Sequence, residues 1–351
     1  MKFTKTAVAL SAAALALMSA CTTPAATTAP SASAPATDAA ASSAPAASGD
    51  LKITILPKNL GNPYFDTSTK GMEAAAKEIG ATTEQVGPAE AAADAQVQYI
   101  ETATQQKVSA IALSANDQTA LCDSVKAAQA AGVKVVTFDS DAPTCRDLFI
   151  NQATSEGIAK VLVEMAVDQS GGSGEVAVLS ATANATNQNA WIDAMKKSLA
   201  ADHPDIKLVD VVYGDDQDQK SFDETQALLQ KHPKLKVIVA PTTVGIAAAA
   251  RYISTSDAKG KVMVTGLGTP NDMRAFVKDG TVKEFALWNP EELGYLTVHA
   301  IKALADGTIK GAEGDKFTAG KLGDYTVGAN QTVLLGDPYK FNAENIDNFN
   351  F

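Results

Sequence analysis

The chain is poor in the side chains that carry most covalent and metal chemistry, because its 351 residues include only three histidines and three cysteines. His203, His232 and His299 have no spacing that would bind zinc, and they lie on predicted helices or just before a proline. We expect all three to be solvated. The composition therefore gives no support to a metal site or to histidine-based acid–base catalysis.

Nucleotide and hydrolase motifs are also missing. The sequence has no Gly-x-Ser-x-Gly element, and Gly320-Lys321 is followed by leucine where a phosphate-binding loop needs serine or threonine. Residues 266–271 begin like a dinucleotide fingerprint, but Asn271 stands where the third glycine belongs. We therefore expect no cofactor.

Long apolar runs are absent after the first twenty residues. No later run approaches the roughly 20 residues needed to cross a membrane. At the start, Lys2 and Lys5 precede a short apolar stretch, which predicts a signal peptide over residues 1–20. The stretch ends in Leu-Met-Ser-Ala before Cys21, which resembles the lipobox of bacterial lipoproteins and implies a lipid on Cys21. An ordinary signal peptide cut at an alanine-rich site is the alternative.

Low complexity marks the next segment. Residues 22–49 contain only Ala, Thr, Ser, Pro, Gly and one Asp, which cannot bury enough apolar surface to form a core. With Cys21 they form a predicted linker over residues 21–49, between an anchor and a folded module. The formal net charge of −11 argues against nucleic acid or an anionic lipid surface as a partner.

About 300 residues from Leu51 onward have a globular composition, which favours two domains with separate cores. Strands are expected at 52–57, 110–114, 134–139, 175–181, 207–213, 237–242, 261–266, 283–288 and, near the C-terminus, 331–335. Helices are expected at 64–79, 92–106, 119–131, 188–200, 220–231, 244–254, 272–277 and 291–305. This alternation predicts an α/β fold with two doubly wound lobes, each a parallel sheet covered by helices.

Polar and aromatic side chains follow nearly every predicted strand. In open α/β sheets the ligand lies beyond the carboxyl ends of the strands. Two such rims facing each other would enclose a hydroxyl-rich ligand, because Asp and Asn bond hydroxyls while aromatic faces cover C–H surface. The candidate ligand-binding residues are Lys58, Asn62, Phe65, Asp139, Asp141, Asn187, Gln188, Trp191, Pro241, Thr243, Trp288 and Asn289. For any one of them, capping, turn formation or core packing is the alternative.

Two cysteines remain beyond the leader, Cys122 and Cys145. In an oxidising compartment an even pair favours a disulfide, and these two flank one helix–strand unit. Two buried thiols are the alternative.

Several runs in both lobes match one known family. They are Leu56-Pro57-Lys58, Gly61-Asn62-Pro63-Tyr64-Phe65, Phe138-Asp139-Ser140-Asp141, Ile150-Asn151-Gln152, Thr186-Asn187-Gln188-Asn189-Ala190-Trp191, Ala240-Pro241-Thr242-Thr243-Val244-Gly245 and Phe285-Ala286-Leu287-Trp288-Asn289-Pro290. The chain from residue 51 resembles the ribose-type substrate-binding proteins of bacterial ABC importers, which have the periplasmic-binding-protein type I fold. Within them it is similar to the rhamnose-binding branch and to the autoinducer-2 receptors.

The resemblance implies two Rossmann-like lobes joined by three crossings of the chain that act as a hinge. The N-terminal lobe would comprise residues 51–152 and 290–325, and the C-terminal lobe residues 153–289 and 326–351. A monomer of this kind closes around a sugar outside the cytoplasm and is then recognised by a membrane permease. The lipid on Cys21 would hold it at the membrane.

The finer ligand assignment depends on a few positions. Lys58, Asp139 and Pro241 match the autoinducer-2 receptors, as does Gln188, whereas Asn187 replaces their aspartate. Thr243 replaces the alanine of the autoinducer-2 receptors. The asparagine at 187 and the threonine at 243 both resemble the rhamnose branch. Rhamnose is therefore the expected ligand, with autoinducer-2 as the alternative.

Two other functions stay open at this point. One is a sugar sensor without transport, which would present the same closed surface to a different membrane partner. The other is an enzyme on a related two-lobe fold that uses Asp139 or Asp141 as a base.

Overall fold

The computed structural model describes residues 51–351, which fold into two lobes with separate sheets. The predicted signal peptide at 1–20, the lipid site Cys21 and the linker to residue 49 lie outside the described residues. Within 51–351, no helix has the length and apolar character to span a bilayer.

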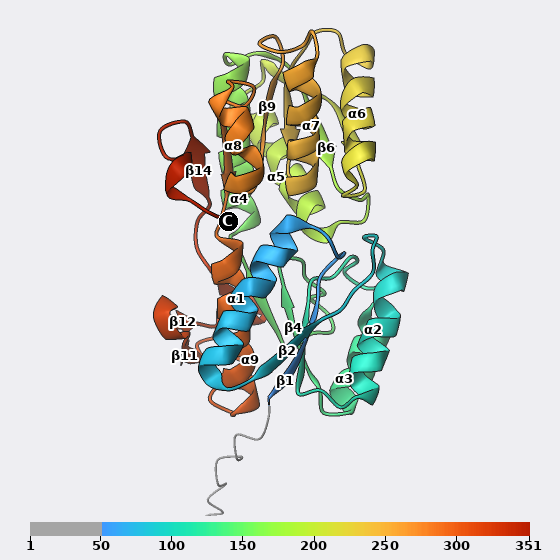
Figure 1. Ribbon diagram of the computed structural model, residues 1–351, viewed down its shortest axis with the longest axis vertical. Coiled ribbons are helices and arrows are strands. Elements are labelled where there is room, and N and C mark those ends of the chain that lie inside the picture. The colour runs from blue at the N-terminus through green and yellow to red at the C-terminus, as the bar shows by residue number, and fades with distance from the viewer. Residues whose placement is uncertain (1–50) are drawn as a thin grey trace, which may run out of the picture. The chain divides into compact units, whose positions relative to one another are not determined.

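The first lobe is built on a six-stranded parallel sheet with the order β13-β5-β4-β3-β1-β2. Its strands are β1 (Lys52–Leu56), β2 (Thr82–Gln85), β3 (Ala110–Leu113), β4 (Lys134–Phe138), β5 (Leu148–Asn151) and β13 (Thr332–Leu334). Its helices are α1 (Pro63–Ile79), α2 (Ala93–Gln105), α3 (Cys122–Ala130) and α9 (Pro290–Ala305). In Figure 1, α1 and α9 lie on one side of this sheet and α2 and α3 on the other.

The second lobe has a parallel sheet with the order β7-β6-β8-β9. Its strands are β6 (Gly174–Ser180), β7 (Ile206–Tyr213), β8 (Leu235–Ala240) and β9 (Met263–Gly266). Its helices are α4 (Ser155–Ser170), α5 (Thr186–Asp202), α6 (Asp218–Lys231), α7 (Thr243–Thr255) and α8 (Pro270–Lys278). An antiparallel pair, β10 (Glu284–Leu287) and β14 (Tyr339–Asn342), adjoins β9 through a single bridge from Leu267 to Ala286.

Both sheets follow the prediction because their central strands are apolar on both faces. All four residues of β3 are buried, as a strand covered by helices on both sides requires. The α/β class with parallel sheets flanked by helices is therefore confirmed. The patterns did not predict β2, β5 or α4. Each missed strand has only four residues, and α4 begins just after the expected lobe boundary between residues 152 and 153.

The chain crosses between the lobes three times: from β5 to α4, from β10 to α9, and from β13 to β14. The last crossing comes later than the predicted boundary at 325/326, because β13 pairs with β5 at the edge of the first sheet. Residues 332–334 thus belong to the first lobe. Only β14 and the residues after it return to the second lobe, where Phe341 stacks on Phe285 at 5.1 Å between ring centroids.

A small hairpin, β11 (Lys316–Thr318) and β12 (Asp324–Thr326), follows α9 and corrects the expectation for one histidine. The residue between these strands, Gly320, covers Tyr295 and His299 so closely that a Cβ on it would lie 2.1 Å from the Tyr295 hydroxyl and 3.0 Å from His299 Nε2. His299 is therefore only 7% exposed rather than solvated. Burial lowers the pKa of His299 below its usual value, so the ring stays neutral at neutral pH.

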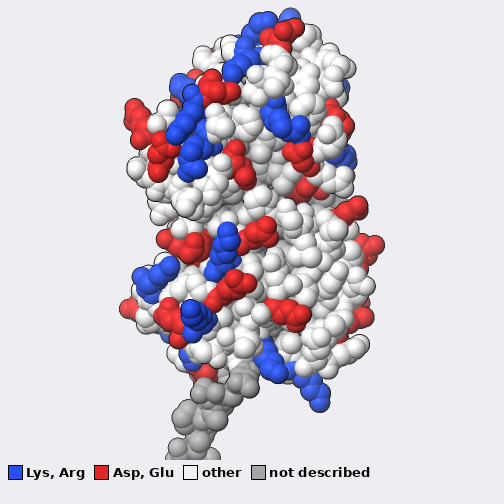
Figure 2. All heavy atoms as spheres, viewed as in Figure 1, with Lys and Arg blue, Asp and Glu red and all other residues white. Residues whose placement is uncertain are grey.

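The surface carries both signs of charge. Figure 2 shows basic side chains interspersed among acidic ones on the face in view, rather than gathered into one patch. Several pairs form exposed ion pairs, among them Lys340 with Glu164 at 3.0 Å and Lys259 with Asp279 at 2.9 Å. Exposed pairs of this kind each contribute little to stability.

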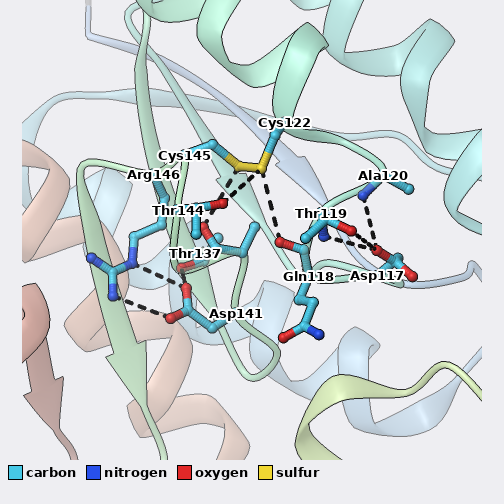
Figure 3. Close-up of a disulfide and its surroundings, with 11 residues drawn as sticks. Asp117, Gln118, Thr119, Ala120, Cys122, Thr137, Asp141, Thr144, Cys145 and Arg146 are labelled. Carbon is cyan, nitrogen blue, oxygen red and sulfur yellow. Dashed lines mark hydrogen bonds and ion pairs between the residues drawn. A yellow bond between two sulfur atoms is a disulfide. The ribbon is translucent and has the colours of Figure 1, made fainter.

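A disulfide joins Cys122, the first residue of α3, to Cys145 in the loop after β4. Figure 3 shows it beside Thr144 and Gln118. Both cysteines are nearly buried, at 7% and 5% exposure, in the core between the sheet and helices α2 and α3.

Replacing both cysteines by serine should lower the free energy of unfolding by about 3 kcal/mol, because the bond closes a loop between residues 23 positions apart. Urea unfolding of Cys122→Ser/Cys145→Ser against the wild type measures this difference. Wild-type protein treated with a reductant should behave like the variant. Equal unfolding midpoints for all three samples would show that the bond does not stabilise the fold.

Candidate functional site

A pocket lies where the carboxyl ends of the strands of both sheets meet. It is lined by Lys58, Asn62, Tyr64, Phe65, Asp139, Asn187, Gln188, Trp191, Asp216, Pro241, Thr242, Thr243, Leu267, Leu287 and Trp288. The first lobe contributes the loop after β1, the start of α1 and the turn after β4. The second lobe contributes the first turns of α5 and α7 and the residues at or after the ends of β7, β8, β9 and β10. Ten of the twelve candidate residues therefore line one pocket.

Three polar side chains form a connected group across the two lobes. The Lys58 ammonium donates to the Asn187 side-chain oxygen at 2.9 Å and lies 3.8 Å from the Asp139 carboxylate. The Asn187 amide donates to the same carboxylate at 3.4 Å. The side chains of Lys58 and Asp139 are only 5% and 6% exposed, so the charges are held away from bulk water and interact strongly. Lys58 and Asp139 come from the first lobe and Asn187 from the second, which makes this group a polar contact between the lobes.

Asp139 is fixed by its backbone and by a neighbouring hydroxyl. It is the first residue after β4 and has a φ of 60°, a left-handed conformation that aspartate tolerates better than most side chains. Its Oδ2 accepts a hydrogen bond from Ser114, the residue after β3, at 2.7 Å. The turn thus points a carboxylate into the pocket with one oxygen already held in place.

Aromatic rings form the other side of the pocket. Trp288 lies 5.9 Å from Trp191 and 6.0 Å from Tyr64, measured between ring centroids, and Tyr64 lies 5.1 Å from Phe65. The Trp288 indole donates to the Tyr64 hydroxyl at 2.9 Å, again joining the two lobes. Burial, and then the charge of Asp139, raise the pKa of Tyr64 well above its ordinary value, so the phenol is neutral.

The remaining polar residues are positioned by helix starts and strand ends. Asn62 caps α1 by accepting from the Tyr64 backbone N–H at 3.1 Å, and Thr243 donates to the same oxygen at 3.5 Å. The Gln188 side-chain oxygen accepts from Ser180 and from the Ala181 backbone, at 2.6 and 2.8 Å. Its amide group is therefore left with its donors for the pocket.

Two predicted residues lie elsewhere. Asp141 forms an ion pair with Arg146, 3.1 Å from its Nε, and accepts from Thr137 at 2.6 Å (Figure 3). Asn289 caps α9, where its side chain accepts from the backbone N–H groups of Glu291 and Glu292. Neither residue lines the pocket, because each side chain forms its hydrogen bonds with residues close to it in the sequence.

One charged residue of the pocket escaped the sequence analysis. Asp216 lines it from the loop after β7, a strand that was expected to end at Tyr213. The rule that ligand residues follow strands would have found it there. Two further lining residues, Leu267 and Leu287, are apolar and carry no signal of their own.

The chemistry of this lining is that of binding. The polar groups that reach the pocket are carboxylates, amides, hydroxyls and one ammonium, all suited to hydrogen bonds with hydroxyl groups. Over residues 51–351, no group of three or more His, Cys, Asp or Glu side chains is arranged to hold a metal ion.

Residues 53–309 match the family model described as a periplasmic binding protein domain. The chain is 56% identical to a sugar ABC transporter structure from Actinomyces odontolyticus, over 86% of this chain and 97% of that one, with a TM-score of 0.69.

Two other similar structures are complexes with a small ligand. An ABC transporter solute-binding protein from Clostridium phytofermentas with bound L-rhamnose is 38% identical over 86% of this chain and 98% of its own, with a TM-score of 0.83. LsrB from Clostridium saccharobutylicum in complex with AI-2 is 26% identical over 86% of this chain and all (100%) of its own, with a TM-score of 0.81. The structures from Actinomyces odontolyticus and Clostridium phytofermentas are of ABC transporter proteins, and the family implies a location outside the cytoplasm. The chain therefore belongs to the periplasmic binding protein family, as a sugar ABC transporter solute-binding protein and not an enzyme.

Proposed function

We propose that this protein captures a neutral monosaccharide, L-rhamnose, between its two lobes and delivers it to an ABC permease. The observation that carries the proposal is the division of one pocket into a connected polar side and a connected aromatic side. A 6-deoxy sugar has the matching division, because it carries hydroxyls on part of its ring and a methyl group on another.

The polar side suits hydroxyl groups. Asp139 accepts hydrogen bonds from hydroxyl groups, and Lys58 donates to hydroxyl oxygens. The side-chain oxygens of Asn187 and Gln188 are already bonded within the protein, so their NH2 groups are the ones that can donate to the ligand. Each well-made hydrogen bond to a charged group is worth about 1.5–3 kcal/mol, enough to choose between related sugars.

The aromatic side suits C–H surface and the methyl group. Trp191, Trp288 and Leu287 offer apolar surface in the lining. A hexose that placed its CH2OH group against this surface would have a hydroxyl without a hydrogen-bond partner, whereas a methyl group fits it. Together with Phe65, these residues would pack on the ring and its methyl.

The comparisons support rhamnose over autoinducer-2 without deciding between them. The L-rhamnose complex is more similar to this chain than the AI-2 complex, at 38% against 26% identity. Asn187 and Thr243 also stand where the autoinducer-2 pattern has aspartate and alanine. Autoinducer-2 is the alternative ligand.

A hinge motion would accompany capture. The three crossings connect the lobes, and the bond from Lys58 to Asn187 joins them directly, so moving the lobes apart would break it. The 56% identical structure superposes with a TM-score of 0.69, lower than the 0.83 of the more distant L-rhamnose complex. A different angle between otherwise similar lobes would lower the score in this way. A ligand that contacts both lobes would favour the closed form.

The N-terminal residues complete the proposal. A signal peptide over 1–20, a lipid on Cys21 and a linker to residue 49 would tether the monomeric binding protein to the membrane near its permease. A sensor that replaces the permease as the membrane partner is the alternative, and permease and ATPase genes next to rhamnose catabolism genes would favour import.

Sugar binding should change the tryptophan fluorescence strongly, because the chain has only two tryptophans and both line the pocket. Titration with L-rhamnose, D-ribose, D-arabinose and autoinducer-2, followed by fluorescence and by calorimetry, measures the affinity for each. We expect L-rhamnose to bind most tightly. Heat and a fluorescence change with autoinducer-2 but not with L-rhamnose would replace the ligand, and no response to any of the four would contradict the proposed function.

A further inference from the structure

A second carboxylate enters the pocket from the lobe opposite Asp139. Asp216 lies three residues after the end of β7 and lines the pocket. Its Oδ1 accepts a hydrogen bond from the hydroxyl of Thr242, another lining residue. Among residues 51–351, no side chain or backbone group donates to its Oδ2. One oxygen is thus held in place and the other is free to accept.

The backbone before Asp216 is built to hold it there. Gly214 and Asp215 donate their backbone N–H groups to Ser180 and Ala181 at the end of β6, at 2.9 and 3.0 Å. Asp215 and Asp216 then both adopt a left-handed backbone, with φ of 55° and 51°. Asp139 has the same unusual conformation, so both carboxylates of the pocket stand on backbone that most residues avoid.

The charges around Asp216 make this arrangement costly without a ligand. Burial raises the pKa of the Asp216 carboxyl above its usual value, and the nearby charges of Asp139 and Asp215 act in the same direction. The hydrogen bond from Thr242 and the charge of Lys58 oppose the rise. Lys58 is thus the cation whose charge acts on both pocket carboxylates, and both carboxylates can accept hydrogen bonds from hydroxyl groups.

We propose that Asp216 is a specificity-determining residue that accepts one particular sugar hydroxyl from the second lobe, so that the ligand is held between two carboxylates, Asp216 and Asp139. The inference rests on the proposed function and adds to it a contact and a chemical requirement: the ligand needs hydroxyl donors toward both lobes. A ligand with donors on one edge only would leave Asp216 desolvated and unpaired.

The test uses two asparagine variants of adjacent residues. Asp216→Asn keeps the shape, the left-handed backbone and an oxygen for Thr242, and it removes only the charged acceptor. Asp215→Asn is the matched control, because Asp215 has the same backbone conformation but points to Lys220 and is 39% exposed at its side chain. Of L-rhamnose, D-ribose and D-arabinose, the sugar that wild-type protein binds most tightly is carried forward.

We expect Asp216→Asn to lose at least about tenfold in affinity for that sugar, and Asp215→Asn to stay within about twofold of wild type. Analogues of the sugar that each lack one hydroxyl then identify the contact. The Asp216→Asn penalty should vanish for one analogue and persist for the others. A fold-supporting role would give the same penalty with every analogue, which would overturn the inference.

Thermal unfolding of the sugar-free proteins provides an independent readout. A carboxyl whose pKa is raised by folding begins to cost stability above its unfolded-state pKa, and the cost is complete above the raised pKa. Asp216→Asn should therefore unfold at a higher temperature than wild type at pH 8. Lower stability together with lower affinity would mean that Asp216 supports the fold, against the inference. If wild-type protein binds the sugar and Asp216→Asn binds it with the same affinity, the inference alone is overturned. If wild-type protein binds none of the sugars, the proposed function and the inference are both overturned.

Discussion

Asp139→Asn is expected to weaken sugar binding by about 2–3 kcal/mol, roughly 30- to 150-fold, because it removes the charged acceptor of the first lobe. The same change takes away the anion that lies 3.8 Å from the buried Lys58 ammonium, which then points into the pocket without its closest counter-charge. Calorimetric titration with L-rhamnose measures the loss.

Asp141→Asn, two residues further along, is the matched control with the opposite outcome. Asp141 pairs with Arg146, whose side chain is 1% exposed, so its loss should lower the free energy of unfolding by about 2–3 kcal/mol. Sugar affinity should stay within about twofold of wild type, because Asp141 does not line the pocket. If Asp141→Asn weakened binding as much as Asp139→Asn, the assignment of the two roles would be wrong.

Gly294→Ala is expected to lower the free energy of unfolding by about 3 kcal/mol or more, although alanine normally stabilises a helix interior relative to glycine. Helices α1 and α9 approach each other through two glycines. A Cβ on Gly294 would lie 1.9 Å from the carbonyl oxygen of Ser68, and one on Gly71 would lie 1.9 Å from that of Glu291. Because the obstacles are backbone atoms, the helices themselves would have to move apart.

Urea unfolding measures this effect, with Lys70→Ala as the control. Lys70 precedes Gly71 on α1 but its side chain is exposed, so its replacement should change stability by less than about 0.5 kcal/mol. The sign of the Gly294→Ala effect is decisive. A variant as stable as wild type or more stable would mean that helix propensity outweighs packing, and that the two helices are not in such close contact.

The pocket residues found from sequence share one physical property: each stands at or near the carboxyl end of a strand that was itself recognisable. Lys58 follows β1, Asp139 follows β4 and Pro241 follows β8. Asp141 and Asn289 also follow strands and were predicted as ligand-binding residues for that reason, but they do not line the pocket. A side chain after a strand can turn to the ligand, to a neighbouring arginine or to a helix start, and its partner in space decides between them.

Two strands of the first sheet were also beyond the sequence. β2 and β5 have four residues each, too few for a periodic pattern to stand out from a loop. A strand was expected at 331–335 and is β13, but its neighbour in the sheet was not predicted. The place of β13 beside β5 depends on pairing between segments about 180 residues apart, so the third crossing could not be located from the local sequence.

The sequence alone determined the architecture, since alternating apolar strands and amphipathic helices can bury their surfaces only as helices packed on parallel sheets. It also determined which side chains were available beyond the strands for binding. The tertiary structure decided which of them meet: it joined Lys58, Asp139 and Asn187 into one group, turned Asp141 and Asn289 away, and brought in Asp216. The physical reason is that strand and helix patterns are local, whereas a pocket between two lobes is formed by contacts between residues far apart in the chain.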